Sequence, residues 1–166
     1  MSKNKDSSLQ KDAEEVITRN RKALHNYFVD ERHEAGVVLL GTEVKSLRDH
    51  RVQLIDAYAR FENGELWLLN AHISPYTMGT HENHEPTRPR KLLMKKRELN
   101  RLQNKTEQAG FTLIPLSFYL KDGRIKVELG LCRGKKQFDK REAIRKRESA
   151  REIARTHAHH HRLRGE

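Results

Sequence analysis

The stretch Ala57–Asn70, AYARFENGELWLLN, carries the strongest fold signal in the chain. Apolar and polar residues alternate on both sides of Asn63-Gly64, as they do in strands that bury one face. A two-residue type I′ turn needs positive φ at both central residues, and Asn-Gly is the dipeptide that adopts this geometry most readily. The stretch therefore predicts a β-hairpin with its turn at residues 63 and 64.

A second hairpin is predicted further along the chain. LIPLSFYL and IKVELGLC flank Lys121-Asp122-Gly123-Arg124, which again has an Asp-Gly pair at the turn. Upstream, Val16–Val29 is rich in β-formers, and the continuous apolar run Val37–Leu40 is typical of a fully buried strand. About six strands, mostly antiparallel, are expected.

Two helices are predicted between these strands. GTEVKSLRDH has Thr42 as a candidate N-cap, with Val44 and Leu47 spaced to share one face. KLLMKKRELNRLQNKTEQAG, residues 91–110, has leucines on one face and a C-terminal glycine. A long loop from Pro75 to Pro89 precedes it. The fold class expected is mainly β, a small antiparallel OB-like barrel with two or three appended helices, because a barrel removes exposed sheet edges.

The ends of the chain differ from this central region. Residues 1–15 are polar and predict a flexible arm, residues 16–133 form the barrel, and residues 134–166 form a basic tail. The tail carries 11 Lys and Arg against 5 Asp and Glu. With so few large apolar residues it cannot offset its ordering entropy, so we expect it to be disordered when free and to fold only on an anionic partner.

The charge predicts a polyanionic partner. The net charge is +11 and the isoelectric point about 9.9. Basic residues cluster at Arg19–Lys22, at Lys45 with Arg48 and Arg51, at Arg88–Lys91 and at Lys135-Lys136. Such clusters bind phosphates by releasing counterions. The alternative is that these charges only keep a small barrel soluble.

Signals for catalysis and for metal binding are weak. No nucleophile elbow, Walker loop or dinucleotide loop occurs, and the carboxylates Glu34, Glu43 and Asp56 have no diagnostic spacing. HENHE (residues 81–85) and HAHHH (residues 157–161) lack the spacing of a zinc motif. Cys132, the single cysteine, is predicted to be a buried thiol. We therefore expect no enzyme activity, no cofactor and no metal. No apolar run is long enough to span a bilayer, which favours a cytoplasmic protein.

Several segments resemble one family in the same order along the chain. NRKALHNYF, EAGVVLLGTEVKSLRD, DAYARFENGELWLLNAHISPY, RPRKLLMKKREL and VELGLCRGKKQFDKRE are similar to segments of small protein B, the SsrA-binding proteins of bacteria. The resemblance covers residues 20 to 147. It implies an OB-like barrel that binds transfer-messenger RNA and delivers it to stalled ribosomes.

The resemblance also implies site residues. Asn20, Glu34, Leu93 and Lys126 match family positions that grip the tRNA-like domain of that RNA. The tail motif GKKQFDKR, residues 134–141, matches family positions that lie at the decoding centre of the ribosome. The chain beyond it matches the family tail that enters the messenger channel. With the basic clusters, the predicted RNA-binding set is Asn20, Arg21, Lys22, Glu34, Lys45, Arg48, Arg90, Lys91, Leu93 and Lys126. The predicted ribosome-contacting set is Gly134, Lys135, Lys136, Phe138, Asp139, Lys140 and Arg141.

Three functions stay open on the residues alone. The first is a non-enzymatic adaptor for transfer-messenger RNA that contacts the small-subunit decoding centre and is monomeric when free. The second is a general ribosomal-RNA-binding or ribosome-assembly protein. The third is a metal-dependent hydrolase that uses the carboxylates or HENHE.

Overall fold

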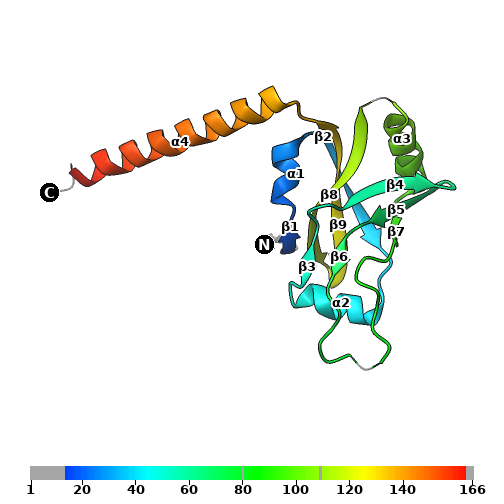
Figure 1. The fold of residues 1–166 in the computed structure, drawn as a ribbon. Helices are drawn as coiled ribbons and strands as arrows, with labels where there is room; N and C mark the ends of the chain where they lie inside the picture. Colours follow the sequence, from blue (N-terminus) through cyan, green and yellow to red (C-terminus); the bar gives the residue numbers. More distant parts are fainter. Residues whose placement is uncertain (1–13, 80, 109, 164–166) are drawn as a thin grey trace, which may run out of the picture.

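Both predicted hairpins are present in the structure, a computed structural model that describes residues 14–79, 81–108 and 110–163 (Figure 1). Strands β4 (Tyr58–Glu62) and β5 (Glu65–Leu69) flank Asn63 and Gly64, whose φ angles are 52° and 76°. Strands β8 (Phe111–Lys121) and β9 (Arg124–Gly134) flank Asp122 and Gly123, with φ of 51° and 71°. Positive φ at both central positions confirms the predicted turn geometry.

The main sheet closes on itself. Its strand order is β1-β8-β4-β5-β7-β2-β9, and β8 also pairs with β9, which completes a ring of antiparallel strands. Strands β1 (Glu15–Arg19), β2 (Tyr27–Val37) and β7 (Arg90–Leu93) supply the rest, and β1 lies outside the ring on β8. A separate two-stranded sheet joins β3 (Val52–Gln53) to β6 (His72–Ile73). The predicted antiparallel OB-like barrel is confirmed.

Alternate residues of the strands fill the barrel. Leu66 and Leu68 of β5, Phe118 of β8, and Leu129 and Leu131 of β9 are buried, and most of their sequence neighbours on the same strands are less buried. Cys132 is an exception, because it is buried in a second, smaller apolar cluster. Each fully buried Leu or Phe stabilises the fold by about 1.5–3 kcal/mol relative to an exposed one. The hydrophobic alternation in the sequence is therefore the pattern of this core.

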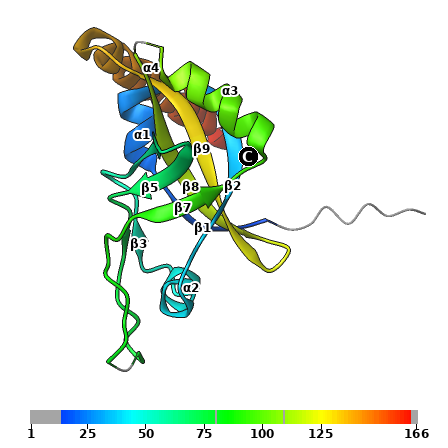
Figure 2. The same ribbon diagram turned by 90° about the vertical axis from the view of Figure 1, so that its right-hand side faces the viewer.

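The described residues form four helices next to the barrel strands: α1 (Arg21–Asn26), α2 (Gly41–Arg48), α3 (Lys96–Thr106) and α4 (Gln137–Leu163). Figures 1 and 2 place α2 at one end of the barrel and α3 at the other, with α4 starting at the α3 end and extending away. Among the described helices none is both long and apolar enough to cross a membrane. The predicted N-terminal arm lies almost entirely outside the described residues, although Glu15 begins β1. Most of the tail forms α4 in this structure. The disorder of the tail in the free protein stays a prediction.

Three local predictions were wrong. Within the β-prone segment Val16–Val29, residues 21–26 form α1, because the Asn20 side chain caps the helix by accepting from the Ala23 N–H. The apolar run Val37–Leu40 is not a buried strand, because β2 ends at Val37 and Leu40 is 50% exposed.

The third error concerns the start of the second predicted helix. Residues 91–93 belong to β7, where Leu92 enters the core between β5 and β2. The pairing on both sides overrides the helix propensity of this segment. Helix α3 starts only at Lys96. In α2 the predicted N-cap is also corrected, since Glu43 accepts from the Leu40 N–H at 2.8 Å and Thr42 lies inside the helix.

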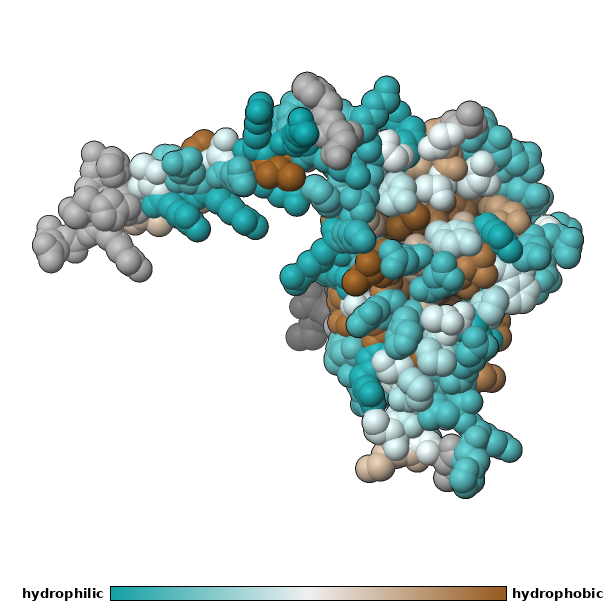
Figure 3. All heavy atoms as spheres, in the orientation of Figure 1, coloured by the Kyte–Doolittle hydropathy of each residue, from teal (hydrophilic) through white to brown (hydrophobic). Residues whose placement is uncertain are grey.

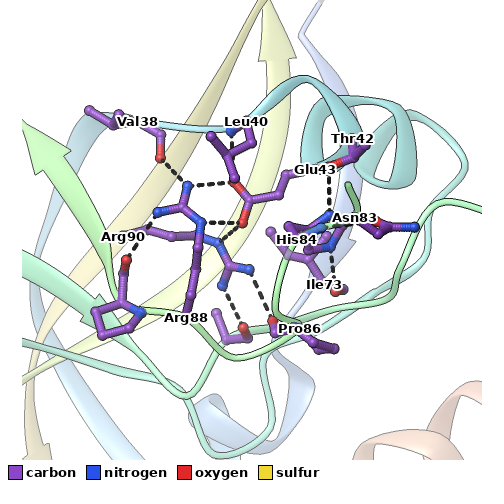
Figure 4. A network of polar contacts seen from close by, with 12 residues as sticks. Val38, Leu40, Thr42, Glu43, Ile73, Asn83, His84, Pro86, Arg88 and Arg90 are labelled. Carbon is purple, nitrogen blue, oxygen red and sulfur yellow. Dashed lines mark hydrogen bonds and ion pairs between the residues drawn. The ribbon is translucent and has the colours of Figure 1, made fainter. Parts of the chain in front are cut away.

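A buried ionic network joins α2 to the barrel (Figure 4). Glu43 and Arg90 are both fully buried, and Arg90 Nε lies 2.8 Å from Glu43 Oε1. Arg88 donates to both oxygens of the same carboxylate, at 2.8 and 2.7 Å. Arg90 also donates to the carbonyls of Ala71 and Pro86. Both carboxylate oxygens and both guanidinium groups have hydrogen-bond partners. The network therefore fixes α2, β7 and the end of the loop of residues 74–89 to one another.

The network also sets the charge of Glu43. Burial raises the pKa of this carboxyl, but hydrogen bonds from Arg88 and the Leu40 N–H, with the charge of Arg90, outweigh burial and hold the pKa below its ordinary value of 4.5. The ionised form is therefore the stable one. The stabilisation is complete above the ordinary pKa and is lost as the pH falls through the lower folded-state pKa.

We predict that Glu43→Gln lowers the free energy of unfolding at pH 7 by about 3–5 kcal/mol, because it leaves Arg90 buried without an anion. The variant should also lose less stability than the wild type as the pH falls below the ordinary carboxyl range. Urea denaturation at several pH values measures both effects. The control Glu65→Gln, which breaks an exposed pair with Lys91, should cost about 1 kcal/mol or less. A loss for Glu43→Gln as small as that of the control would contradict the role of the network.

Candidate nucleic-acid interface

The outward side chains of four adjacent strands form one surface, which we call the outer face. Gly36 of β2 pairs with Leu93 of β7 on one side and with Lys126 of β9 on the other, and Lys126 pairs with Tyr119 of β8. Glu34, two residues before Gly36, faces the same way because side chains alternate along a strand. The structure thus brings Glu34, Leu93 and Lys126, three of the residues predicted from the resemblance, onto one surface.

A groove of about 390 Å³ follows this row. Leu93 is 50% exposed, and Gly36 keeps the groove open, since a Cβ on Gly36 would lie 3.4 Å from the Leu93 Cβ. Val44 of α2 lines the same groove. Arg124 and Lys126 supply its positive charge. The groove therefore combines an apolar wall with cations, which suits a sugar or base face next to a phosphate.

Glu34 is the acidic group of the outer face. The Tyr119 hydroxyl and, at 3.1 Å, the Lys121 ammonium both donate to Oε2. The Tyr119 hydrogen bond is the main reason that the pKa of Glu34 lies below its ordinary value; partial burial opposes it, and Lys121 and Lys126 add to it. Burial, together with the bond to Glu34, raises the pKa of Tyr119, so the hydroxyl remains a donor.

The two carboxylate oxygens of Glu34 differ in their hydrogen bonding. Within the described residues, Oε1 has no hydrogen-bond partner, whereas Oε2 has two. The carboxylate is 40% exposed, so Oε1 can accept from a ligand. A fixed, ionised acceptor on a cationic surface suits the amino, imino or hydroxyl donors of a nucleic acid.

A second groove, of about 410 Å³, is lined by Glu34, two residues before Gly36 on β2, and by Tyr119, which pairs with Lys126, so it lies next to the first groove. Its walls come from β1, α1, β2, β8 and β9, and include Arg19, Arg21 and Leu24. Arg21 and Lys22 are exposed in the first turn of α1. The two grooves therefore form one surface with Glu34 at its centre and cations on both sides.

Asn20 was predicted to contact RNA, but its side chain is buried at the wall of this groove. It is 5% exposed, its amide donates to the carbonyls of Leu54 and Pro115 at 2.9 and 3.0 Å, and its oxygen accepts from the Ala23 N–H. The side chain is therefore fully used inside the protein. By capping α1, it fixes the start of the helix that carries Arg21 and Lys22.

Arg90 is the second correction. Direct contact with RNA was predicted, but its side chain is fully buried against Glu43. Lys91 is partly exposed and pairs with Glu65 at 2.7 Å. Lys45 and Arg48 are exposed on α2, where the Lys45 ammonium lies 5.4 Å from the ring centroid of Tyr76.

The residues predicted to contact the ribosome follow β9 directly. Gly134 ends the strand. Lys135 is held against α1 by two hydrogen bonds: its backbone N–H donates to the Asn26 carbonyl, and its ammonium donates to the Leu24 carbonyl. Helix α4 begins at Gln137, and Asp139 accepts from the Lys136 N–H within the first turn. Lys136, Lys140 and Arg141 lie at the same junction, and Phe138 belongs to α4 with its side chain outside the described part.

The motifs set aside in the sequence have structural roles. His84 of HENHE is 6% exposed and hydrogen-bonds Thr42 and the Ile73 carbonyl, both at 2.9 Å. Among the described residues no group of His, Cys, Asp and Glu is arranged to hold a metal. Cys132 is buried, and burial raises the pKa of its thiol to about 11.

Sequence reasoning missed Tyr119 and Lys121, the partners of Glu34. Both follow the two-residue period of β8, so their common face could have been predicted. Their contact with Glu34 could not, since it depends on β2, more than 80 residues away along the chain.

Comparisons with known proteins all give the same family. The family described as "SmpB protein" matches residues 17–159. The SsrA-binding protein of Desulforudis audaxviator is 58% identical over 147 residues, which is 89% of this chain and 96% of the relative. That of Carboxydothermus hydrogenoformans is 59% identical over 140 residues, 84% of this chain and 94% of the relative. A solved structure described as tmRNA-SmpB in the bacterial ribosome matches with a TM-score of 0.63 and 50% identity, covering 77% of this chain and 94% of that one.

We predict that Tyr119→Phe raises the pKa of Glu34 towards the ordinary carboxyl value, because the hydroxyl donates the hydrogen bond that lowers it most. Lys121 remains in place, so the rise should be incomplete. A pH titration of the Glu34 side-chain carboxyl by NMR measures the shift. Tyr58→Phe, which removes a hydroxyl that makes no bond to Glu34, is the control. An unchanged Glu34 titration in Tyr119→Phe would exclude this arrangement.

Proposed function

Because the chain belongs to the SmpB protein family, we propose that it binds transfer-messenger RNA and brings it to stalled ribosomes in trans-translation. The chain acts as a non-enzymatic RNA-binding adaptor. The structural observation that supports this function is the outer face. Glu34, Leu93 and Lys126 lie together on it, with further basic residues at both edges.

Each group of the outer face has a distinct part in binding the tRNA-like domain. We propose that Lys126 contacts a phosphate and that Leu93 packs on a sugar or base. Glu34 Oε1 accepts from a base or from a 2′-hydroxyl, a group that distinguishes RNA from DNA. The repulsion between this carboxylate and the RNA backbone is limited by Lys121 and Lys126 beside it. Arg21 and Lys22 extend the phosphate contacts along α1.

The tail has a separate part in the proposal. Residues 134–141 contact the decoding centre, and α4 enters the messenger channel, which is vacant only when the message has ended. Support comes from the exposed side chains of α4, and Figure 3 shows the coloured part of this helix as largely hydrophilic. This basic helix meets α1 and extends away from the barrel (Figure 1), which suits an RNA-walled channel. The proposed location is the cytoplasm, and the free protein is proposed to be a monomer.

A general ribosomal-RNA-binding protein remains the second candidate, because phosphate contacts alone carry no sequence information. Recovery of RNA bound to the full-length protein in cells separates the two. Enrichment of transfer-messenger RNA over ribosomal RNA supports the adaptor, and recovery of ribosomal RNA alone excludes it.

We predict that Lys126→Gln weakens binding of the isolated tRNA-like domain by about tenfold and lowers the log–log salt slope by about one, because one phosphate contact is lost. Leu93→Ala should weaken binding comparably but leave the salt slope unchanged, because its contact is apolar. Titrations at several salt concentrations measure both quantities. Arg60→Gln, which removes one cation from another part of the barrel, should change affinity by about twofold or less. Equal slopes for the Lys126 and Leu93 variants would disprove the assignment of the two contacts.

We predict that replacing Asp139, Lys140 and Arg141 by Ala leaves binding of the tRNA-like domain near normal and abolishes peptide tagging on stalled ribosomes. The reason is that these residues lie beyond β9 at the α3 end of the barrel, away from the row formed by Leu93 and Lys126. RNA titration and a tagging assay measure the two functions. Full tagging by the triple variant, or loss of RNA binding, would refute the separation. Glu148→Gln further along α4 is the matched control and should retain both.

A further inference from the structure

Lys135, which the sequence assigns to the ribosome-contacting set, uses its side chain inside the protein. It follows Gly134, the last residue of β9, and is half-buried. Its backbone N–H donates to the Asn26 carbonyl at 2.9 Å, and its ammonium donates to the Leu24 carbonyl at 3.1 Å. The ammonium also lies 5.0 Å from the ring centroid of Phe28. One residue therefore joins the start of the tail to α1 and to the start of β2.

The two carbonyls belong to the end of α1, where a helix needs donors from outside. The last four carbonyls of a helix have no intrahelical partner, and α1 has only six residues. The Tyr27 N–H donates to the first of these carbonyls, that of Ala23. Lys135 donates to two others, those of Leu24 and Asn26. A cation also suits the negative end of a helix. Lys135 is therefore a C-terminal cap of α1, supplied from 111 positions further along the chain than Leu24.

The lysine side chain adds contacts that strand pairing does not provide. The backbone bond continues the β2–β9 ladder, in which Gly134 pairs with Tyr27, so any residue except proline could make it at position 135. The bond to the Leu24 carbonyl and the contact with the Phe28 ring need a cation on a long stem. Lys136, the next residue, is exposed. The two neighbouring lysines therefore differ in how much of their charge faces solvent.

These contacts lie where the direction of the tail is decided. Helix α4 starts at Gln137, two residues after Lys135, and contacts α1, beside which it leaves the barrel in Figure 1. Gly134 does not restrict the direction of the chain, because it has no side chain and a Cβ there would meet nothing within 4 Å. Lys135 is thus the residue between this glycine and α4 that is tied to the barrel by its side chain.

We propose that Lys135 is a positioning residue for the tail, which caps α1 and thereby sets the direction in which the chain leaves the barrel. Its ammonium acts within the protein and does not contact ribosomal RNA. This inference rests on the proposed function, in which the tail enters the messenger channel. A tail with a fixed starting direction loses less conformational entropy on entering the channel, even where the rest of it is disordered beforehand.

The cap is tested in the free full-length protein by amide hydrogen exchange. Lys135→Met keeps the length of the side chain but removes the charge and the donors. The amides of residue 135 and of Tyr27 should then exchange about tenfold faster, as expected for the loss of a hydrogen bond from a charged group. Lys136→Met is the matched control, and its exchange rates should stay within about twofold of the wild type. Unchanged exchange in Lys135→Met would exclude the cap.

A double-mutant cycle separates positioning from direct contact. Peptide tagging on stalled ribosomes is measured for Lys135→Met, for Phe28→Leu and for the double variant. Lys135→Met should slow tagging by about tenfold and Phe28→Leu by about threefold, since the second removes only the aromatic contact of the ammonium. Phe28 is 42% exposed, so its replacement leaves the core intact. The double variant should be no slower than Lys135→Met, because the ring acts through the ammonium. Losses that multiply would overturn the inference.

The salt dependence of binding to the stalled ribosome gives a second criterion. Lys136→Met should lower the log–log slope by about one if its exposed ammonium contacts a phosphate, whereas Lys135→Met should leave the slope unchanged. A slope lowered by about one in Lys135→Met would show that this ammonium binds phosphate, and would overturn the positioning role.

Binding of the isolated tRNA-like domain distinguishes this inference from the proposed function. The Lys135 and Phe28 variants should bind that RNA within about twofold of the wild type, because both residues lie at the opposite end of the β2–β9 pair from Lys126. A larger loss would place Lys135 in the surface for that RNA and overturn the inference. Failure of the wild type to bind the tRNA-like domain would overturn the proposed function instead, and amide exchange would still decide whether Lys135 caps α1.

Discussion

The pairing of β8 with β9 is the constraint on which the rest of the molecule depends. The two strands are paired from Phe111 and Arg133 at one end to Lys121 and Arg124 at the other, and this pairing closes the barrel. It also places Tyr119 and Lys121 beside Lys126, which completes the surroundings of Glu34. At its other end the same pairing fixes where β9 stops and α4 begins. One hairpin therefore positions both the outer face, which we propose binds RNA, and the start of the tail.

A positive net charge did not by itself identify the cations proposed to bind RNA, because the protein uses its basic residues in two different ways. Arg90 and Arg88 bind one buried carboxylate and stabilise the junction of α2 with the barrel, so their charge is largely neutralised inside the protein. Lys126, by contrast, makes no ion pair within the described residues. The difference lies in burial and in the position of Glu43, and a count of charges along the sequence contains neither.

The parts of the fold that could be predicted are those encoded by neighbouring residues. Asn63-Gly64 and Asp122-Gly123 specify their turns through the φ angles that these residues tolerate, and the alternation on either side specifies the buried face. The parts that could not be predicted depend on distant partners. Asn20 reads as an RNA contact in the sequence, but its amide bonds carbonyls 34 and 95 residues away. The segment 91–93 has helical propensity and becomes a strand only because β2 and β5 lie on both sides of it. For the same reason the resemblance located Glu34, Leu93 and Lys126, while their common surface and the role of Tyr119 required the fold.

The rigidity of the barrel connects these surfaces in a way that a flexible chain would not. Lys126 and Gly134 belong to one strand, eight residues and about 26 Å apart, and β9 is paired on both sides along this length. Because paired strands deform little, an RNA held at the outer face keeps a fixed distance and orientation to the point where the tail leaves the barrel. Asn20 and the Glu43–Arg90 pair add to this by fixing α1 and α2 to the same barrel through buried contacts. The geometry between the two binding regions is therefore set before either RNA is bound, so little conformational entropy is lost in the barrel when both are engaged.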